Sequence, residues 1–205
     1  RALTLSQRAL GRAHRDNVDL MANLGGLLAS SRRYGEADSL LRDALAIAER
    51  EFGAEDRRLL RPLNNLAFSY EQQERAAEAE QLYRRLLVIR EGELGAEHVE
   101  VARLLGIIAG LNEKVGRYAD AEPQRRRALA VLEKAYRTPH NDLARGLMMV
   151  GWNLHLQGRA AEAEPLARRS VVMFEATSGA EHVSVAEALQ NLAIVTSDQA
   201  RYAEA

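Results

Sequence analysis

The sequence predicts an all-α fold, an α-solenoid in which helix-turn-helix repeats stack one on the next. Three observations predict this class. Ala, Leu, Glu and Arg dominate the 205 residues and aromatic residues make up only 5%, a composition typical of helical proteins. Marker residues recur every 42 positions. Within each period the apolar residues follow a helical spacing that is interrupted twice.

Four columns of equivalent residues define the period. The first is a linker column with glycine at most positions: Gly11, Gly53, Gly95, Arg137 and Gly179. A His or Asp column follows three residues later: His14, Asp56, His98, His140 and His182. The other two columns hold Tyr or Ala, and Ala alone: Tyr34, Ala76, Tyr118, Ala160 and Tyr202, then Ala37, Ala79, Ala121, Ala163 and Ala205. Because all four share one register, complete repeats are predicted at 12–53, 54–95, 96–137 and 138–179.

Each repeat is predicted to be a helical hairpin, as the repeat 96–137 illustrates. Its apolar residues from Val99 onward follow the period of one helix, Gly116 breaks that helix, and a second helix begins near Tyr118. The ends follow the same register: residues 1–11 are the end of a preceding second helix, and 180–205 begin a further repeat whose second helix starts at Tyr202. We therefore expect a single solenoid fragment over 1–205, whose uncapped ends could associate end to end.

Small residues are expected where the two helices of a hairpin cross, because without bulky side chains two backbones can approach closely. Such residues recur midway along each first helix: Gly25, Ala67, Ala109, Gly151 and Ala193. The His or Asp column is interpreted as the cap of each first helix. A shared metal site is rejected, because residues one repeat apart lie roughly 10 Å apart whereas zinc ligands lie about 2 Å from one ion.

Charge and motif content exclude several function classes. With 28 basic and 29 acidic residues the net charge is −1, so a nucleic-acid partner, which needs a sustained basic field, is not expected. The chain has no Cys, no nucleotide-binding glycine motif and no His-Glu-x-x-His, and we predict no catalytic residue, no metal site and no cofactor. No apolar stretch has transmembrane length, so no membrane partner is expected and a cytoplasmic location is predicted. The preference for Arg over Lys is interpreted as the codon bias of a GC-rich bacterial genome.

The repeat resembles the tetratricopeptide repeat (TPR), in the 42-residue form found in kinesin light chain. The matching segments are the linker 94–98 (Leu-Gly-Ala-Glu-His), the first-helix segment 63–67 (Leu-Asn-Asn-Leu-Ala) and the second-helix segment 118–123 (Tyr-Ala-Asp-Ala-Glu-Pro). The resemblance covers the whole chain, with departures at Arg137, Ala76 and Ala160. It implies a right-handed TPR superhelix in which the first helix of each repeat lines a concave groove that binds partner proteins.

The resemblance also indicates which first-helix residues face this groove. One column is mostly Asn, whose amide can hold the backbone of an extended peptide: Asn23, Asn65, Ile107, Met149 and Asn191. A second column, four residues earlier and thus on the same helix face, has Arg in the middle and an acid at each end: Asp19, Arg61, Arg103, Arg145 and Glu187. The three Arg are predicted to form a basic stripe that binds carboxylates. The alternative is that they pair with acidic residues of neighbouring repeats.

An apolar pocket is expected beside this stripe. Gly106 and Gly110 leave a gap, and Met148, Met149 and Trp152 supply large apolar side chains next to it, of kinds that are enriched at protein interfaces. The alternative for Trp152 is packing between hairpins. A pocket adjoining a basic stripe would suit a short segment with an aromatic or aliphatic anchor flanked by Asp or Glu.

The predicted function is therefore a protein–protein interaction module without enzymatic activity, which binds an acidic peptide or partner segment through an apolar anchor. The predicted partner-binding residues are Asn23, Arg61, Asn65, Arg103, Arg145, Met149, Trp152 and Asn191. The alternative is a structural or regulatory sensor segment of a larger bacterial signalling protein, packed on a fused effector domain. The fold by itself does not decide between these functions.

Overall fold

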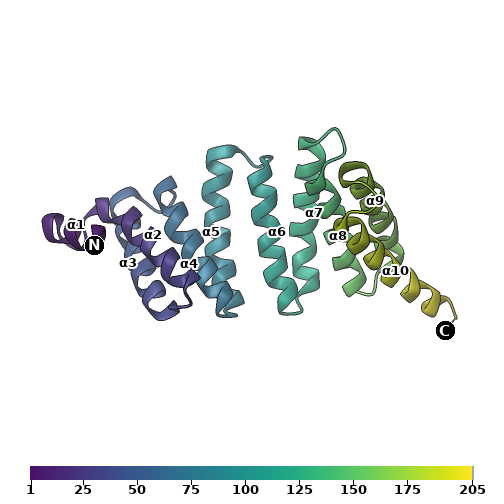
Figure 1. Ribbon diagram of the computed structural model, residues 1–205, viewed down its shortest axis with the longest axis horizontal. Helices are drawn as coiled ribbons and strands as arrows, with labels where there is room; N and C mark the ends of the chain where they lie inside the picture. Colours follow the sequence, from purple (N-terminus) through teal and green to yellow (C-terminus); the bar gives the residue numbers. More distant parts are fainter. Residues whose placement is uncertain (205) are drawn as a thin grey trace. The chain divides into compact units, whose positions relative to one another are not determined.

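The computed structural model describes the backbone of residues 1–204 and the side chains of residues 1–197. Within this range the chain forms α-helices, short 3-10 turns and connecting turns, without a strand, so the predicted all-α class is confirmed (Figure 1). The chain divides into two compact units, residues 1–96 and 97–205. The division lies within one residue of the boundary that the 42-residue period predicts between the second and third complete repeats.

The first unit contains one short helix, α1 (Ala2–Leu10), and two helical hairpins. The first hairpin consists of α2 (Val18–Ser30) and α3 (Tyr34–Phe52), and the second of α4 (Leu60–Gln72) and α5 (Ala76–Leu94). A single turn of 3-10 helix precedes both α2 and α4. Helix α2 packs against α3 and also against α4, so the two hairpins stack as the repeat predicts.

The second unit contains two complete hairpins and one further helix. Its elements are α6 (Val99–Lys114), α7 (Tyr118–Ala135), α8 (Asn141–Leu156), α9 (Ala160–Ser178) and α10 (Val183–Glu204). Each of these helices packs against the next one along the chain, which gives the antiparallel order from α6 to α10 visible in Figure 1. Because α7 packs against α8, the two hairpins stack on each other.

Left-handed backbone conformations make the inner turn of each hairpin. At this position φ is 60° in both Arg32 and Glu74, 77° in Gly116 and 75° in Gly158. Glycine adopts such angles without strain, whereas Arg and Glu do so at a cost of roughly 1 kcal/mol. The packing of the second helix against the first offsets that cost.

One predicted turn is absent. The register places the inner turn of the last repeat at residue 200 and a second helix from Tyr202, but α10 continues without interruption to Glu204. Residue 200 is Ala, for which a left-handed conformation is strained. The helix therefore continues through the expected turn. Ala205 lies outside the described residues.

The predicted helix caps are confirmed in every repeat. The side chain of the His or Asp column accepts a hydrogen bond from the backbone N–H two residues later, for example His98 Nδ1 from Glu100 at 3.2 Å and Asp56 Oδ1 from Arg58 at 2.9 Å. The same bond is made at His14, His140 and His182. Each cap satisfies a backbone donor that lacks a partner within the helical turn.

Close approach of the helices is also confirmed at the small-residue columns. Their fully buried members are Ala37, Ala67, Ala79, Ala109, Ala121 and Ala163. At Gly25, an added Cβ would lie 2.5 Å from Cγ of Leu41. Any larger residue there would force Leu41 to move, which explains why this crossing requires glycine.

Candidate functional site

A pocket of about 360 Å³ lies in the second unit, where α6, α7 and α8 meet. Its surface is mainly apolar, and each of the three helices contributes a small residue. The apolar lining includes Ala102, Gly106, Ile107, Ala128, Leu132, Gly146 and Met149. Charged residues from the same helices surround this apolar part: Glu100, Arg103, Arg125, Asp142 and Arg145. The pocket therefore combines an apolar interior with a charged rim.

The pocket occupies a place that is filled in the following repeat. There, Met148, Phe174 and Ala188 belong to one buried hydrophobic cluster and are 7%, 1% and 0% exposed. The residues 42 positions earlier are Gly106, Leu132 and Gly146, all of which line the pocket. All three have smaller side chains than their equivalents, so the inter-repeat core is hollow here.

The pocket lining includes three arginines and two carboxylates, and one of the arginines, Arg125, is neutralised by an ion pair with Glu113. Arg103 donates a 2.9 Å hydrogen bond to Glu100 on its own helix, which neutralises part of its charge. Arg145 is exposed and has neither a hydrogen bond nor an ion pair within the described part of the chain. An unpaired guanidinium at a pocket rim is available to a carboxylate of a ligand.

The other acidic residue of the rim, Asp142, has partners of its own. Its carboxylate accepts a 3.1 Å hydrogen bond from the hydroxyl of Tyr136, whose ring stacks on His140 with 3.6 Å between centroids. Burial and this bond raise the pKa of Tyr136 above its usual value. Asp142 is thus held in place by the linker between α7 and α8.

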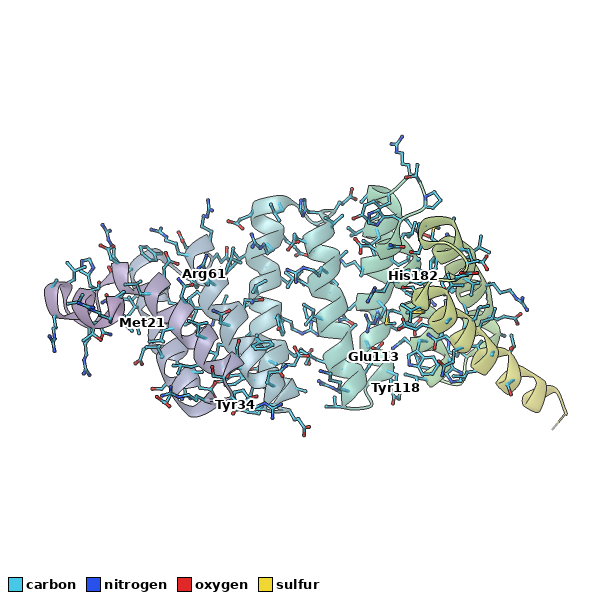
Figure 2. All side chains as sticks on the ribbon, viewed as in Figure 1. Met21, Tyr34, Arg61, Glu113, Tyr118 and His182 are labelled. Atoms are coloured by element: carbon cyan, nitrogen blue, oxygen red, sulfur yellow. The ribbon has the colours of Figure 1, made fainter. Side chains whose placement is uncertain are left out.

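The third arginine of the lining, Arg125, is less exposed than the other two and forms an ion pair between α6 and α7. Arg125 donates to Glu113 through Nε at 3.1 Å and through Nη2 at 2.6 Å, and both side chains are largely buried, at 12% and 15% exposure. Asn153 of α8 adds a 2.9 Å hydrogen bond to the same carboxylate. Glu113 lies near the C-terminal end of α6 (Figure 2).

Three of the predicted residues meet at this pocket. Arg103 of α6 and Arg145 and Met149 of α8 all line it, together with Ile107 of the mostly Asn column and with Gly106. Gly106, where a gap was expected, lines the pocket with Arg103 and Arg145. Met149 also packs on the hydrophobic cluster of the following repeat.

Other predicted residues of the second unit lie elsewhere. Trp152 is half-buried beside His155, with 5.0 Å between ring centroids, and is not part of the pocket lining. Asn191 is half-buried on α10. Met148, expected to supply groove surface, instead belongs to the buried cluster with Phe174; this expectation was wrong because Met148 occupies the helix face that packs against the next repeat.

In the first unit, predicted residues bind one another. Arg61 of α4 donates a 2.5 Å hydrogen bond to Asn23 Oδ1 of α2, and Arg61 is exposed at the start of its helix (Figure 2). Asn65 donates through its amide to the carbonyl of Ala22 at 2.8 Å. The amide expected to hold a ligand backbone thus connects α4 to α2 in this structure.

Arg125 was not among the predicted residues. Its column contains Leu41, Tyr83 and Ala167 in the other repeats, all buried, so the column indicates hydrophobic core. The signal in the sequence was an Arg at a core position opposite two glycines, Gly106 and Gly110. Only the approach of α7 to α6 reveals that these residues adjoin.

Together, the stacked hairpins and the pocket between them define a helical-repeat scaffold for protein interactions. Sequence profiles of the tetratricopeptide repeat match residues 18–58, 58–134, 104–176 and 142–205. These segments cover most of the chain, which therefore belongs to the tetratricopeptide repeat family. No sequence of a curated protein matches it significantly.

Several crystal structures have a similar fold. The TPR-like repeats of a kinesin light chain from Podospora anserina are 20% identical, with a TM-score of 0.76 over 93% of this chain and 90% of that one. BtubC (BKLC) from P. vanneervenii is 22% identical, with a TM-score of 0.72 over 86% and 73%. Aspartyl phosphate phosphatase F from Bacillus subtilis is 16% identical, with a TM-score of 0.68 over 92% of this chain and 48% of that one. At these identities the likeness shows the fold alone.

Two further properties concern only the described residues. Among them, no three His, Asp or Glu side chains are grouped closely enough to hold a metal ion. In the same part of the chain, no helix has both the length and the apolar character needed to cross a lipid bilayer.

Proposed function

We propose that this TPR chain binds an extended acidic segment of a partner protein, whose large apolar side chain enters the pocket between α6, α7 and α8. The observation that carries this proposal is the hollow at Gly106, Leu132 and Gly146, where the next repeat has packed core. Interiors of proteins are close-packed, so an open apolar hollow of this kind favours a guest side chain. Its volume of about 360 Å³ lies within the usual range of ligand pockets.

The charge around the pocket supports an acidic ligand. Arg145, which is exposed and unpaired among the described residues, and Arg103 lie on adjacent first helices at the rim. Carboxylates of Asp or Glu on either side of the anchor would meet these guanidinium groups in charge-assisted hydrogen bonds. Arg61, Asn23 and Asn65 of the first unit, with Trp152 and Asn191, remain proposed contacts for the rest of a longer ligand.

Nucleic acid is a poorer candidate. The whole chain has a net charge of −1, and the pocket places Glu100 and Asp142 beside its arginines. Phosphate backbones are bound through sustained positive fields, which two carboxylates at the rim would interrupt. We expect no membrane partner, no cofactor and a cytoplasmic location, as from the sequence.

The test measures binding of labelled twelve-residue peptides by fluorescence anisotropy. One pool has a central Leu, Met or Phe flanked by Glu, and a matched pool has the same anchors flanked by Lys. We expect saturable binding of the Glu pool at roughly micromolar Kd, weakening with salt, and no binding of the Lys pool. The emission of Trp152, the single tryptophan, gives a second readout with tryptophan-free peptides.

The alternative function predicts a different result. A regulatory segment that packs on a fused effector domain would bind that domain but neither peptide pool. Equal binding of the two pools would contradict the role of the arginines, but it would still support binding of the apolar anchor. Absence of binding by both pools would contradict the proposal itself.

A further inference from the structure

We propose that Arg125 is a specificity-determining residue of the pocket, and that its guanidinium binds a carboxylate side chain of the ligand beside the apolar anchor. This inference rests on the proposed function, because it assigns part of the same pocket to one ligand group. It adds a deep acidic subsite to the contacts at the rim. The ligand class is therefore a segment in which Glu or Asp directly adjoins the anchor residue.

The position of Arg125 is unusual for this fold. The equivalent residues Leu41, Tyr83 and Ala167 are buried and apolar or aromatic, and the side chain of Arg125 is only 12% exposed. Arg is almost never buried unless it is paired. Among these four equivalent positions, only position 125 has a charged side chain in place of a packed apolar or aromatic one.

The ion pair uses only one edge of the guanidinium. Hydrogen bonds to Glu113 come from Nε and Nη2, whereas Arg has five N–H donors. Within residues 1–197, Nη1 of Arg125 has no hydrogen-bond partner. The free edge thus keeps donors for a second carboxylate, and Arg125 is itself part of the pocket lining.

Two glycines leave this edge uncovered. An added Cβ would lie 3.7 Å from Nη1 at Gly106 and 3.7 Å from Nη2 at Gly110. Both residues lie on the face of α6 that also carries Glu113, because steps of four and three residues share one helix face. Side chains at these two positions would lie against the guanidinium, so the glycines form a window between Arg125 and the groove.

Glycine has a poor propensity for helix interiors, yet α6 contains two of them one turn apart. A lack of space does not explain the two glycines, since a distance of 3.7 Å is ordinary van der Waals contact and Ala would fit at both positions. The glycines are explained if a ligand has to reach the guanidinium of Arg125. Gly106 is the more important of the two, because it lines the pocket with Arg125.

Arg125 should discriminate more sharply than the rim arginines. Arg103 and Arg145 are exposed, and charge interactions at exposed sites are weakened by water and salt. Hydrogen bonds in a low-dielectric site are stronger, and a neutral ligand group there leaves a charged donor poorly satisfied. The deep subsite therefore distinguishes Glu from Gln, which has nearly the same shape.

The experiment compares two tryptophan-free probe peptides that differ in one residue. Each is a twelve-residue peptide of Gly, Ser and Ala with one central Phe, followed by Glu in one and by Gln in the other. Affinities are measured for the wild-type chain, for Arg125→Lys, which keeps a charge for Glu113 but lacks the second edge, and for Gly106→Ala, which covers Nη1. The matched controls are Arg126→Lys, the next residue on α7, and Gly92→Ala on α5, where an added Cβ meets nothing within 4 Å.

We expect the wild-type chain and both controls to prefer the Glu peptide about tenfold, the effect of one charge-assisted hydrogen bond. Arg125→Lys should bind the two peptides within about twofold of each other, and Gly106→Ala should reduce the preference. The Nε–Hε resonance of Arg125, identified by its absence in Arg125→Lys, should shift with the Glu peptide and not with the Gln peptide. This second measurement is made on the wild-type chain, and the Arg125→Lys variant is needed only to assign the resonance.

Other results would contradict either the role of Arg125 or the proposed function. A full Glu preference in folded Arg125→Lys, or an Arg125 resonance that ignores the Glu peptide, overturns the deep subsite while peptide binding itself stands. If the wild-type chain binds the Glu-flanked pool but neither of these two peptides, this inference alone is overturned. If it binds none of these peptides, the proposed function is overturned as well.

Discussion

Glu122 accepts a 2.6 Å hydrogen bond from Nη1 of Arg159, the residue that precedes the second helix of the following repeat. The first unit has the same connection between Asp38 and Arg75, also 37 residues apart, at 3.2 Å. In both units the side-chain amide of the residue that follows the intervening first helix also donates to the carboxylate, from Gln157 at 3.0 Å or Gln73 at 3.1 Å. These partly buried polar contacts tie one hairpin to the next.

We predict that Glu122→Gln lowers the free energy of unfolding by about 2 kcal/mol, because charge-assisted hydrogen bonds to Arg159 and Gln157 are weakened. Burial acts to raise the pKa of Glu122, but the hydrogen bonds from Arg126, Gln157 and Arg159 outweigh it, and the pKa is lowered. A carboxylate with a lowered pKa stabilises the fold above its unfolded pKa and loses this contribution in acid. Urea unfolding at pH 7 and at pH 4 measures both effects.

The matched control is Glu164→Gln, at the equivalent position one repeat later. Among the described side chains, Glu164 pairs with Arg168 on its own helix, and such pairs contribute about 0.3–0.5 kcal/mol. Equal losses for the two variants would show that the connection between hairpins adds nothing.

Filling the pocket should stabilise the chain and abolish binding. Leu132→Phe introduces the residue found at the equivalent position, Phe174, into the open hollow. We expect a gain of about 0.5–2 kcal/mol in unfolding free energy and at least tenfold weaker binding of the Glu-flanked peptide pool. Thermal unfolding and anisotropy titrations test the two outcomes.

Leu129→Phe serves as the comparison for this variant. Leu129 is buried on the same helix but does not line the pocket, so the larger ring overpacks the core at a cost of about 1–3 kcal/mol. A destabilisation of similar size by Leu132→Phe would mean that the hollow cannot accept an aromatic side chain.

Reversing charge at the rim should weaken binding without unfolding the protein. Arg145→Glu is expected to lower affinity for the Glu-flanked pool at least tenfold, because Arg145 is unpaired among the described residues. Arg103→Glu should have a smaller effect, since Glu100 already accepts a hydrogen bond from Arg103. The control is Arg57→Glu, which makes the same change of net charge on an exposed side chain of the first unit. This variant should bind the pool as the wild type does, because affinity depends on where the charge lies and not on net charge.

The cap at Asp56 should make stability depend on acid pH. Hydrogen bonds from the side chain and backbone of Arg58 lower the pKa of Asp56 from 3.8 to about 2. Because the folded pKa is the lower one, the contribution is complete above about pH 4 and is lost as pH falls toward 2. Asp56→Asn keeps a capping side chain without a titrating group, so its urea midpoint should fall less than that of the wild type between pH 4 and 2. Parallel curves for the two proteins would contradict this.

The fold was predictable because it depends on local and repeated features. The glycine and His columns marked the turns and caps, and the caps at His98 and Asp56 form as expected. The turn expected at residue 200 does not form, because α10 continues to Glu204 and a left-handed conformation is strained for Ala.

The candidate site was predictable only in part. Arg103, Arg145 and Met149 could be placed on one face by helical steps, and they do line a common pocket. Trp152 and Asn65 shared that periodicity but are engaged with His155 and with Ala22. Periodicity gives the direction of a side chain from its helix, whereas its partners depend on what the neighbouring helix presents.

The sequence by itself determined the 42-residue hairpin, its boundaries and its caps, because turns, caps and apolar spacing depend on residues close together in the chain. The tertiary structure alone decided where the core is hollow and what lies beneath it. Gly106, Leu132 and Gly146 come from three helices, and Arg125 reaches Glu113 only because α7 packs on α6. A cavity is the space left after several side chains have packed, so it depends on their volumes together and on no one of them.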